Sequence, residues 1–186
     1  MLSVAKPYSS FLLPLAREDA QVPEADRPIS NNHTPTEFFY MQWGFYDPPA
    51  HPESSSAAIN RLAGGTAKDG QLPPTSTVIF TPLVEFQTHK SFAVPHLVIT
   101  HYTDLAETHG LVLLRGEITP RGSSADNSEV QYQLSQHHAQ ALALGVQKFY
   151  LWTDEGNERE ALLKTFHEHP QDFKWEDLLR LSDSAV

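Results

Sequence analysis

The sequence predicts an α+β fold, in which a central, mostly antiparallel β-sheet is covered on one face by C-terminal helices. Apolar and polar side chains alternate in several segments before residue 120, and this period of two is typical of β-strands. The last three of these segments are separated by short gaps, which favours antiparallel neighbours. The final third of the chain changes to a helical period, and strands followed by helices indicate this fold class.

Five segments have the pattern of strands. The first contains Pro14, which is typical of an edge strand because proline has no N–H to donate. In the third segment we expect Val78, Phe80, Val84 and Phe86 to point to the covered face of the sheet. The five segments are Phe11–Leu15, Glu37–Tyr46, Thr77–His89, His96–Tyr102 and Gly110–Ile118.

Three helices are expected in the C-terminal third. The first has Ser128 as its N-cap and runs towards Leu144. Gly145 either ends or interrupts this helix, and residues 146–151 form either a strand or its last stretch. The second and third helices are Asn157–His167 and Trp175–Leu181. The side chains expected to be buried on the first and third helices are Val130, Leu134, Ala141, Leu144, Trp175, Leu178, Leu179 and Leu181.

Length and composition predict a single domain over residues 1–186. A chain of 186 residues buries about 70% of its unfolded-state surface, so it needs no covalent support. Cysteine is absent, which excludes disulfides, thiolate metal sites and a cysteine nucleophile. Two stretches, 17–36 and 47–76, are rich in proline and small or polar residues, and we expect long flexible loops there.

The charge of the chain excludes some classes of partner. Its formal charge is −10, with 23 acidic and 13 basic residues, which argues against nucleic acid and anionic membranes as partners. No apolar run approaches the roughly 20 residues of a membrane-spanning helix, so no membrane insertion is expected. The first seven residues do not resemble a transit peptide; either the protein is made without one or the sequence begins after its removal.

The sequence contains no motif for catalysis or nucleotide binding. There is no phosphate-binding loop, nucleophile elbow or dinucleotide fingerprint, and the ten histidines do not have the spacing of metal ligands. Glu85 and Arg115 form either a cross-strand charge pair, a general acid–base pair or part of a partner-binding surface. The sequence thus predicts no catalytic, cofactor-binding or metal-binding residue, and no enzyme.

The aromatic run from Phe38 to Tyr46 is the most unusual feature of the sequence. Aromatic residues are common in strands, so the run is consistent with a core strand buried on both faces. Alternatively, its second face stays partly exposed and forms a platform for another protein.

Seven sequence blocks carry a family resemblance, and they span nearly the whole chain: 11–17, 37–43, 80–88, 101–105, 110–117, 147–150 and 165–174. In this order they resemble a mitochondrial assembly-factor family, the ATP eleven family, which chaperones the β subunit of ATP synthase. The stretches 47–76 and 119–128 are longer than the family pattern leads us to expect, and the family's presequence region has no counterpart.

The resemblance implies an ATP-independent chaperone of the mitochondrial matrix, with no cofactor. It would bind the unassembled β subunit of F(1)-ATPase, prevent its aggregation and shield the surface that the α subunit later covers. The alternative is a small-ligand-binding protein or enzyme with a pocket between sheet and helices. A deep pocket of several hundred Å³ lined by polar groups would favour that alternative, and a shallow groove with an exposed apolar strip would favour the chaperone.

The alternation of the strands also predicts a surface for the client protein. The helices would cover the face that carries Val78, Phe80, Val84, Phe86, Val112, Leu114 and Ile118. The other face carries both apolar and charged side chains, and such a surface suits a partner that binds reversibly. The partner-binding residues predicted on this face are Leu83, Glu85, Gln87, Ile99, Arg115 and Glu117.

Overall fold

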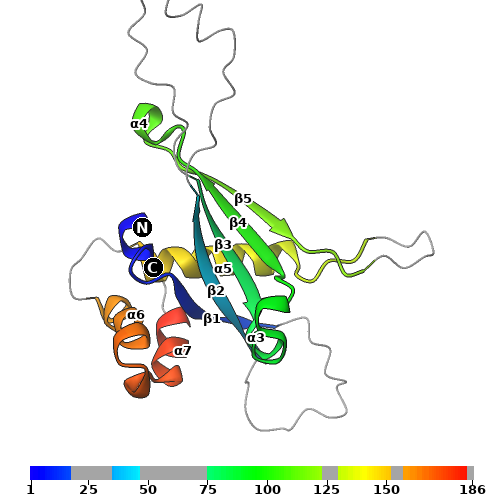
Figure 1. Ribbon diagram of the computed structural model, residues 1–186, viewed down its shortest axis with the longest axis vertical. Coiled ribbons are helices and arrows are strands. Elements are labelled where there is room, and N and C mark those ends of the chain that lie inside the picture. Colours follow the sequence, from blue (N-terminus) through cyan, green and yellow to red (C-terminus); the bar gives the residue numbers. More distant parts are fainter. Residues whose placement is uncertain (18–34, 47–74, 123–129, 152–156, 184–186) are drawn as a thin grey trace, which may run out of the picture.

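The computed structural model describes residues 1–17, 35–46, 75–122, 130–151 and 157–183. Most of the two predicted loops, together with the predicted N-cap Ser128, lies outside these ranges. The described residues form one five-stranded sheet and a set of helices (Figure 1). The predicted α+β class is confirmed.

The sheet is an antiparallel meander in which each strand pairs with the next along the chain, in the order β1-β2-β3-β4-β5. β1, the strand with Pro14, lies at one edge, as expected, and β5 lies at the other. The strands are β1 (Ser10–Ala16), β2 (Thr36–Tyr46), β3 (Thr75–Pro82), β4 (Leu97–Tyr102) and β5 (Leu113–Ile118).

One face of the sheet carries the core. Phe11 lies opposite Met41, Trp43 opposite Val78, and Val78 in turn opposite Ile99, so these side chains share a face. All five are buried. We call this the core face, and the opposite face of the sheet the open face.

Three C-terminal helices and the short N-terminal helix α1 (Leu2–Ala5) pack on the core face. Phe149 of the first helix lies 5.0 Å from the ring of Phe11, and Phe166 of the second lies 5.3 Å from it. The prediction that C-terminal helices cover one face is therefore confirmed. These helices are α5 (Gln136–Tyr150), α6 (Glu158–Glu168) and α7 (Trp175–Asp183), with a 3-10 turn at Pro170–Asp172 between the last two.

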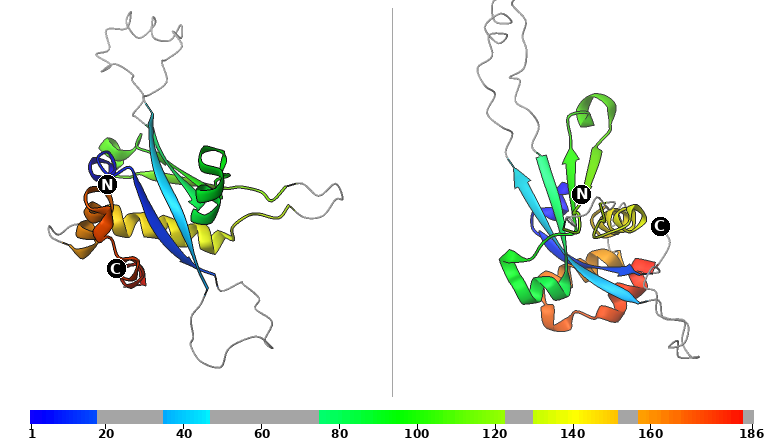
Figure 2. Two further views of the ribbon diagram at one scale, coloured as in Figure 1. Left: turned by 60° about the horizontal axis from the view of Figure 1, so that its bottom comes forward. Right: turned by 90° about the vertical axis from the view of Figure 1, so that its right-hand side faces the viewer.

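The prediction of a strand from Thr77 to His89 is wrong in its second half. The strand ends at Pro82, and helix α3 (Leu83–His89) follows, then a 3-10 turn at Lys90–Phe92. Phe86 packs on Tyr40 of the open face, with ring centroids 4.3 Å apart. Figure 2 shows α3 and α5 on opposite sides of the sheet, so Phe86 and Val84 do not point to the core face.

The first C-terminal helix begins later and ends later than predicted. Ser135 caps it by accepting a hydrogen bond from the backbone N–H of His138, and it continues through Gly145 to Tyr150. A Cβ on Gly145 would meet Leu13 at 3.1 Å, so the glycine permits close packing of the helix on β1. The predicted stripe is wrong for Val130 and Leu144, which are exposed; the buried residues of α5 are His138, Leu142, Val146, Phe149 and Tyr150.

Trp175, expected to be buried, is also exposed, whereas Leu178 and Leu181 on the same helix are buried. A short helix, α4 (Ala106–His109), precedes Gly110, whose φ of 66° ends it in the left-handed region. β5 starts at Leu113 rather than at Gly110, and Val112 therefore lies outside the strand. Across the described ranges, no helix has the length and apolar character needed to cross a membrane.

Candidate interaction surfaces

The open face of β4 and β5 is a mixed apolar and charged surface. Arg115 lies opposite Thr100 and Glu117 opposite Val98, so both charged residues are on the open face, as predicted. The two exposed side chains pair with each other, with Nη2 of Arg115 2.9 Å from Oε1 of Glu117. Exposed pairs of this kind contribute little to stability, which leaves both groups available to a partner.

Leu83, Glu85 and Gln87 lie on α3, and not on a strand, so the predicted cross-strand pair of Glu85 with Arg115 is wrong. Glu85 instead accepts a hydrogen bond from the backbone N–H of Val94 at 3.0 Å and lies 3.5 Å from Nε2 of His96. The helix nevertheless packs on the open face. The three residues thus belong to the same side of the molecule as Arg115, but to a different element.

The placement of Ile99 on the open face is wrong. Ile99 pairs with Val78 on the core face and is only 4% exposed. The register between β3 and β4 decides its side, and a shift of one residue moves every side chain to the other face. Ile99 therefore cannot contact a partner without unfolding of the sheet.

An exposed apolar strip that the sequence reasoning missed precedes and begins β5. Four consecutive residues, Leu111, Val112, Leu113 and Leu114, are between 44% and 53% exposed. Val112 and Leu114 were expected to be covered by the helices, but their side chains are 44% and 48% exposed. A contiguous run of exposed apolar side chains is typical of a protein-binding surface.

The aromatic run on β2 is partly a core strand and partly exposed. Phe39, Met41 and Trp43 are buried, whereas Phe38 and Tyr40 on the second face are half-buried. Phe45 and Tyr46 at the end of the strand are exposed. The core interpretation holds for the middle of the strand, and the exposed platform is limited to its last two residues.

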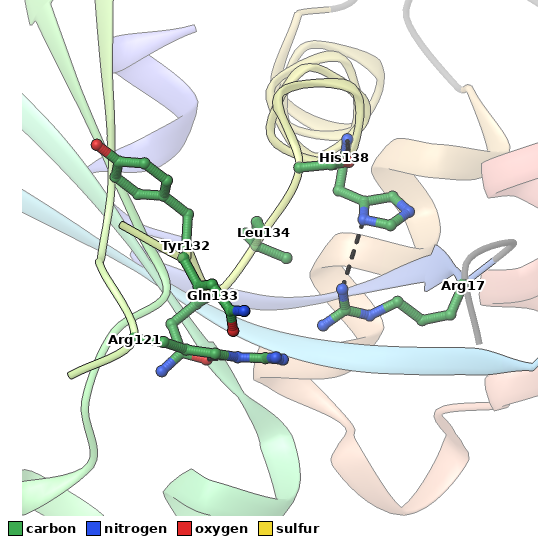
Figure 3. A pocket seen from close by; sticks show the side chains of 8 residues that line it. Arg17, Arg121, Tyr132, Gln133, Leu134 and His138 are labelled. Carbon is green, nitrogen blue, oxygen red and sulfur yellow. Dashed lines mark hydrogen bonds between the residues drawn. The ribbon is translucent and has the colours of Figure 1, made fainter. Parts of the chain in front are cut away.

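A polar hollow lies where β1 and β5 end, next to the start of α5 (Figure 3). Its volume is about 630 Å³, and half of its lining residues are exposed, so it is open to solvent. Arg17 donates to Glu37 from Nε at 2.7 Å and lies 3.4 Å from Nδ1 of His138. Arg121 donates to Oε1 of Gln133 at 3.3 Å.

His96 is close to the groups that line this hollow. Burial lowers the pKa of its imidazole from the ordinary value of 6.5. The carboxylates of Glu37 and Glu85 oppose that shift, and the guanidinium groups of Arg17 and Arg121 add to it. The arrangement offers donors for an anionic group.

A family model described as ATP11 protein matches residues 1–179. The chain belongs to the ATP11 family. Its resemblance to the ATP eleven family, seen in seven sequence blocks, is thereby confirmed.

Three curated relatives agree with the ATP11 assignment. The chain is 28% identical over 169 residues to "Protein atp11, mitochondrial" of Schizosaccharomyces pombe. The matched region covers 89% of this chain and 42% of that protein. It is 33% and 34% identical to "ATP synthase mitochondrial F1 complex assembly factor 1" of Danio rerio and Homo sapiens, over 51% and 52% of this chain. It matches 27% and 25% of their lengths. This ATP11-family chain thus spans less than half the length of the relatives it matches.

Metal ligands do not cluster in the part of this ATP11-family chain that the structure describes: no three His, Asp or Glu side chains there could hold one ion. Its two surfaces therefore differ in kind. The open face with the apolar strip suits a protein partner, and the polar hollow suits an anionic group.

Proposed function

We propose that this chain is an ATP-independent chaperone of the mitochondrial matrix. It binds the unassembled β subunit of the F(1)-ATPase and prevents its aggregation until the β subunit assembles with the α subunit. Family membership supports a role in assembly, since two of the relatives are named F1 complex assembly factors. The names of all three relatives include the word mitochondrial, which supports a location in mitochondria.

The observation that carries the proposal is the exposed strip Leu111–Leu114. Its four apolar side chains provide affinity for the apolar surface that an unassembled subunit exposes. The formal charge of −10 keeps the free chaperone soluble despite this strip. A chaperone of this kind stabilises its client by mass action alone and requires no nucleotide chemistry.

The client surface extends from the strip across the open face. Leu113, Arg115 and Glu117 lie together on the open side of β5. Leu83 and Gln87 of α3 continue the surface towards the other end of the sheet. Glu85 accepts a hydrogen bond from the backbone N–H of Val94 and so links α3 to the segment that follows it. Apolar atoms supply affinity there, while the charged pair sets the register of the partner.

The experiment measures light scattering of isolated F(1) β subunit during heating, with the chaperone and without ATP. The wild-type chain should suppress aggregation at a near-equimolar ratio. Leu113→Ser should weaken capture about tenfold, because it removes an apolar anchor from the strip. Leu144→Ser, a matched loss of an exposed leucine on α5, should leave capture unchanged.

A requirement for ATP in this assay would contradict the proposal. So would equal effects of the two leucine substitutions, since these would place the client elsewhere. Circular dichroism of both variants serves as the control for folding.

The polar hollow favours a second function, the binding of a small anionic ligand between Arg17 and Arg121. The observation that favours it is the pair of guanidinium groups, one of them held by Glu37, at a hollow of about 630 Å³. Titration with tripolyphosphate and with citrate, followed by the melting temperature, tests this function. A rise that is abolished by Arg121→Gln would support it, and no rise with either anion would exclude it.

A further inference from the structure

β5 leaves one edge of the sheet without a neighbour in the described ranges of the chain (Figure 1). Exposed edge strands usually carry a proline, a bulge or charged side chains that prevent pairing with another strand. The other edge strand, β1, has Pro14 in its middle. β5 reads Leu-Leu-Arg-Gly-Glu-Ile and has no proline, and its two charged residues are opposite in sign, so they can complement those of a second copy.

The hydrogen-bonding groups of β5 can be assigned to its two sides. The backbone N–H of Thr119 donates to the carbonyl of His96 on the β4 side, at 3.0 Å. N–H and C=O groups alternate between the two sides of a strand, residue by residue. Leu114, Gly116 and Ile118 therefore direct their backbone groups away from β4, towards the unpaired edge.

We propose that this edge pairs with β5 of a second copy of the chain, antiparallel and about a two-fold axis at Gly116. The two five-stranded sheets then form one continuous sheet. In this register Gly116 lies opposite Gly116 of the second copy, with both residues directing their backbone groups towards each other. Such an interface uses the same surface on both copies, as closed dimers do.

Charge selects this register over its neighbours. With the axis at Gly116, Arg115 lies opposite Glu117 of the second copy, and Glu117 lies opposite its Arg115. Each charge then has an opposite charge both along its own strand, at 2.9 Å, and across the interface. The neighbouring registers that keep the hydrogen bonds place Arg115 opposite Arg115 or Glu117 opposite Glu117, which is unfavourable.

The core-face side of β5 is also self-complementary. Leu114, which is half-exposed, lies opposite Ile118 of the second copy, so the pairing covers part of the apolar strip. Gly116 is not required by the single chain, because a Cβ there would meet only Leu97, at an ordinary 3.6 Å. A glycine within a strand often marks the close approach of another backbone, as pairing across the axis requires.

The pairing is reversible because the edge is short. Six residues a side bury less surface than a permanent dimer needs. Self-association therefore protects the apolar edge of the free protein and releases it on dilution. This inference does not depend on which client the chain binds, and its test contains no client.

The experiment measures the mass of the purified chain by analytical ultracentrifugation over a range of concentrations. The wild-type mass should rise from 20.8 kDa towards twice that value. Arg115→Glu and Glu117→Arg should each raise the dissociation constant about tenfold or more, because each places like charges across the axis. An equimolar mixture of the two variants should dimerise again, since every pair across the mixed interface is then opposite in charge.

The mixture distinguishes repulsion across the interface from damage within one chain. Mixing the two variants removes the repulsion, but it cannot repair a chain that is itself damaged. A second readout uses no substitution: the amides of Leu114, Gly116 and Ile118 should gain protection from hydrogen exchange as concentration rises. A constant mass of 20.8 kDa, or a dimer indifferent to both charge reversals, would overturn the proposal. Protection of these amides only after isolated β subunit is added would also overturn it, and would assign the edge to a client strand.

Discussion

At the scale of single residues, His101 joins the sheet to the last turn of α5. Its ring stacks on Trp43 at 5.2 Å, and Trp43 lies 5.4 Å from the ring of Tyr150. The hydroxyl of Tyr150 donates to the backbone carbonyl of Tyr8 at 2.9 Å. Burial lowers the pKa of His101 from its ordinary value of 6.5, so the imidazole is neutral in the folded protein at pH 7.

The lowered pKa predicts a loss of stability in acid. The unfolded chain binds a proton near pH 6.5 that folded His101 binds only at lower pH, so the free energy of unfolding falls as the pH drops below about 6.5. His96, whose pKa is also lowered, adds to this loss. His101→Phe keeps the aromatic packing and should reduce the pH dependence. Urea denaturation at pH 7.5 and pH 5.5 measures the free energy of unfolding at each pH. An equal difference between the two values in the wild type and in His101→Phe would contradict this role of His101.

At the scale of elements, close packing of α5 on β1 depends on Gly145. A Cβ at this position would meet Cδ1 of Leu13 at 3.1 Å, and the larger side chain of valine would overlap it. Gly145→Val should therefore lower the free energy of unfolding by about 1–3 kcal/mol. Leu144→Val, an equally β-branched replacement at the exposed neighbouring position, should cost well under 1 kcal/mol. Chemical denaturation compares the two, and equal losses would rule out overpacking as the cause.

Strands rich in apolar and aromatic residues were predictable from the sequence, whereas the point at which β3 ends was not. β1 is a short apolar run and β2 is rich in aromatic residues, and both strands are found where expected. Leu83–His89 continues the alternation of β3 in sequence, but it forms helix α3, and its Phe86 packs on Tyr40 of the open face. The N-terminus of α5 was placed too early because Ser128 and Ser135 are equally good caps, and local sequence does not distinguish them.

Across the whole molecule, the sequence predicted a mixed apolar and charged surface, but not all of the residues that form it. Arg115 and Glu117 were placed correctly, because alternation along one strand is a local property. Ile99 was placed wrongly, because its side depends on the register between two strands. The apolar strip was missed for a similar reason: whether a helix extends over β5 is decided by packing, which the strand pattern does not contain.

The proposed recognition of the β subunit before assembly requires selective binding. The measurement is the affinity of the immobilised chain, without nucleotide, for isolated β subunit, isolated α subunit and assembled F(1)-ATPase. If the chain shields the β-subunit surface that the α subunit later covers, it should bind isolated β subunit and bind the other two at least tenfold more weakly. Equal binding to assembled F(1)-ATPase, or none to isolated β subunit, would contradict it.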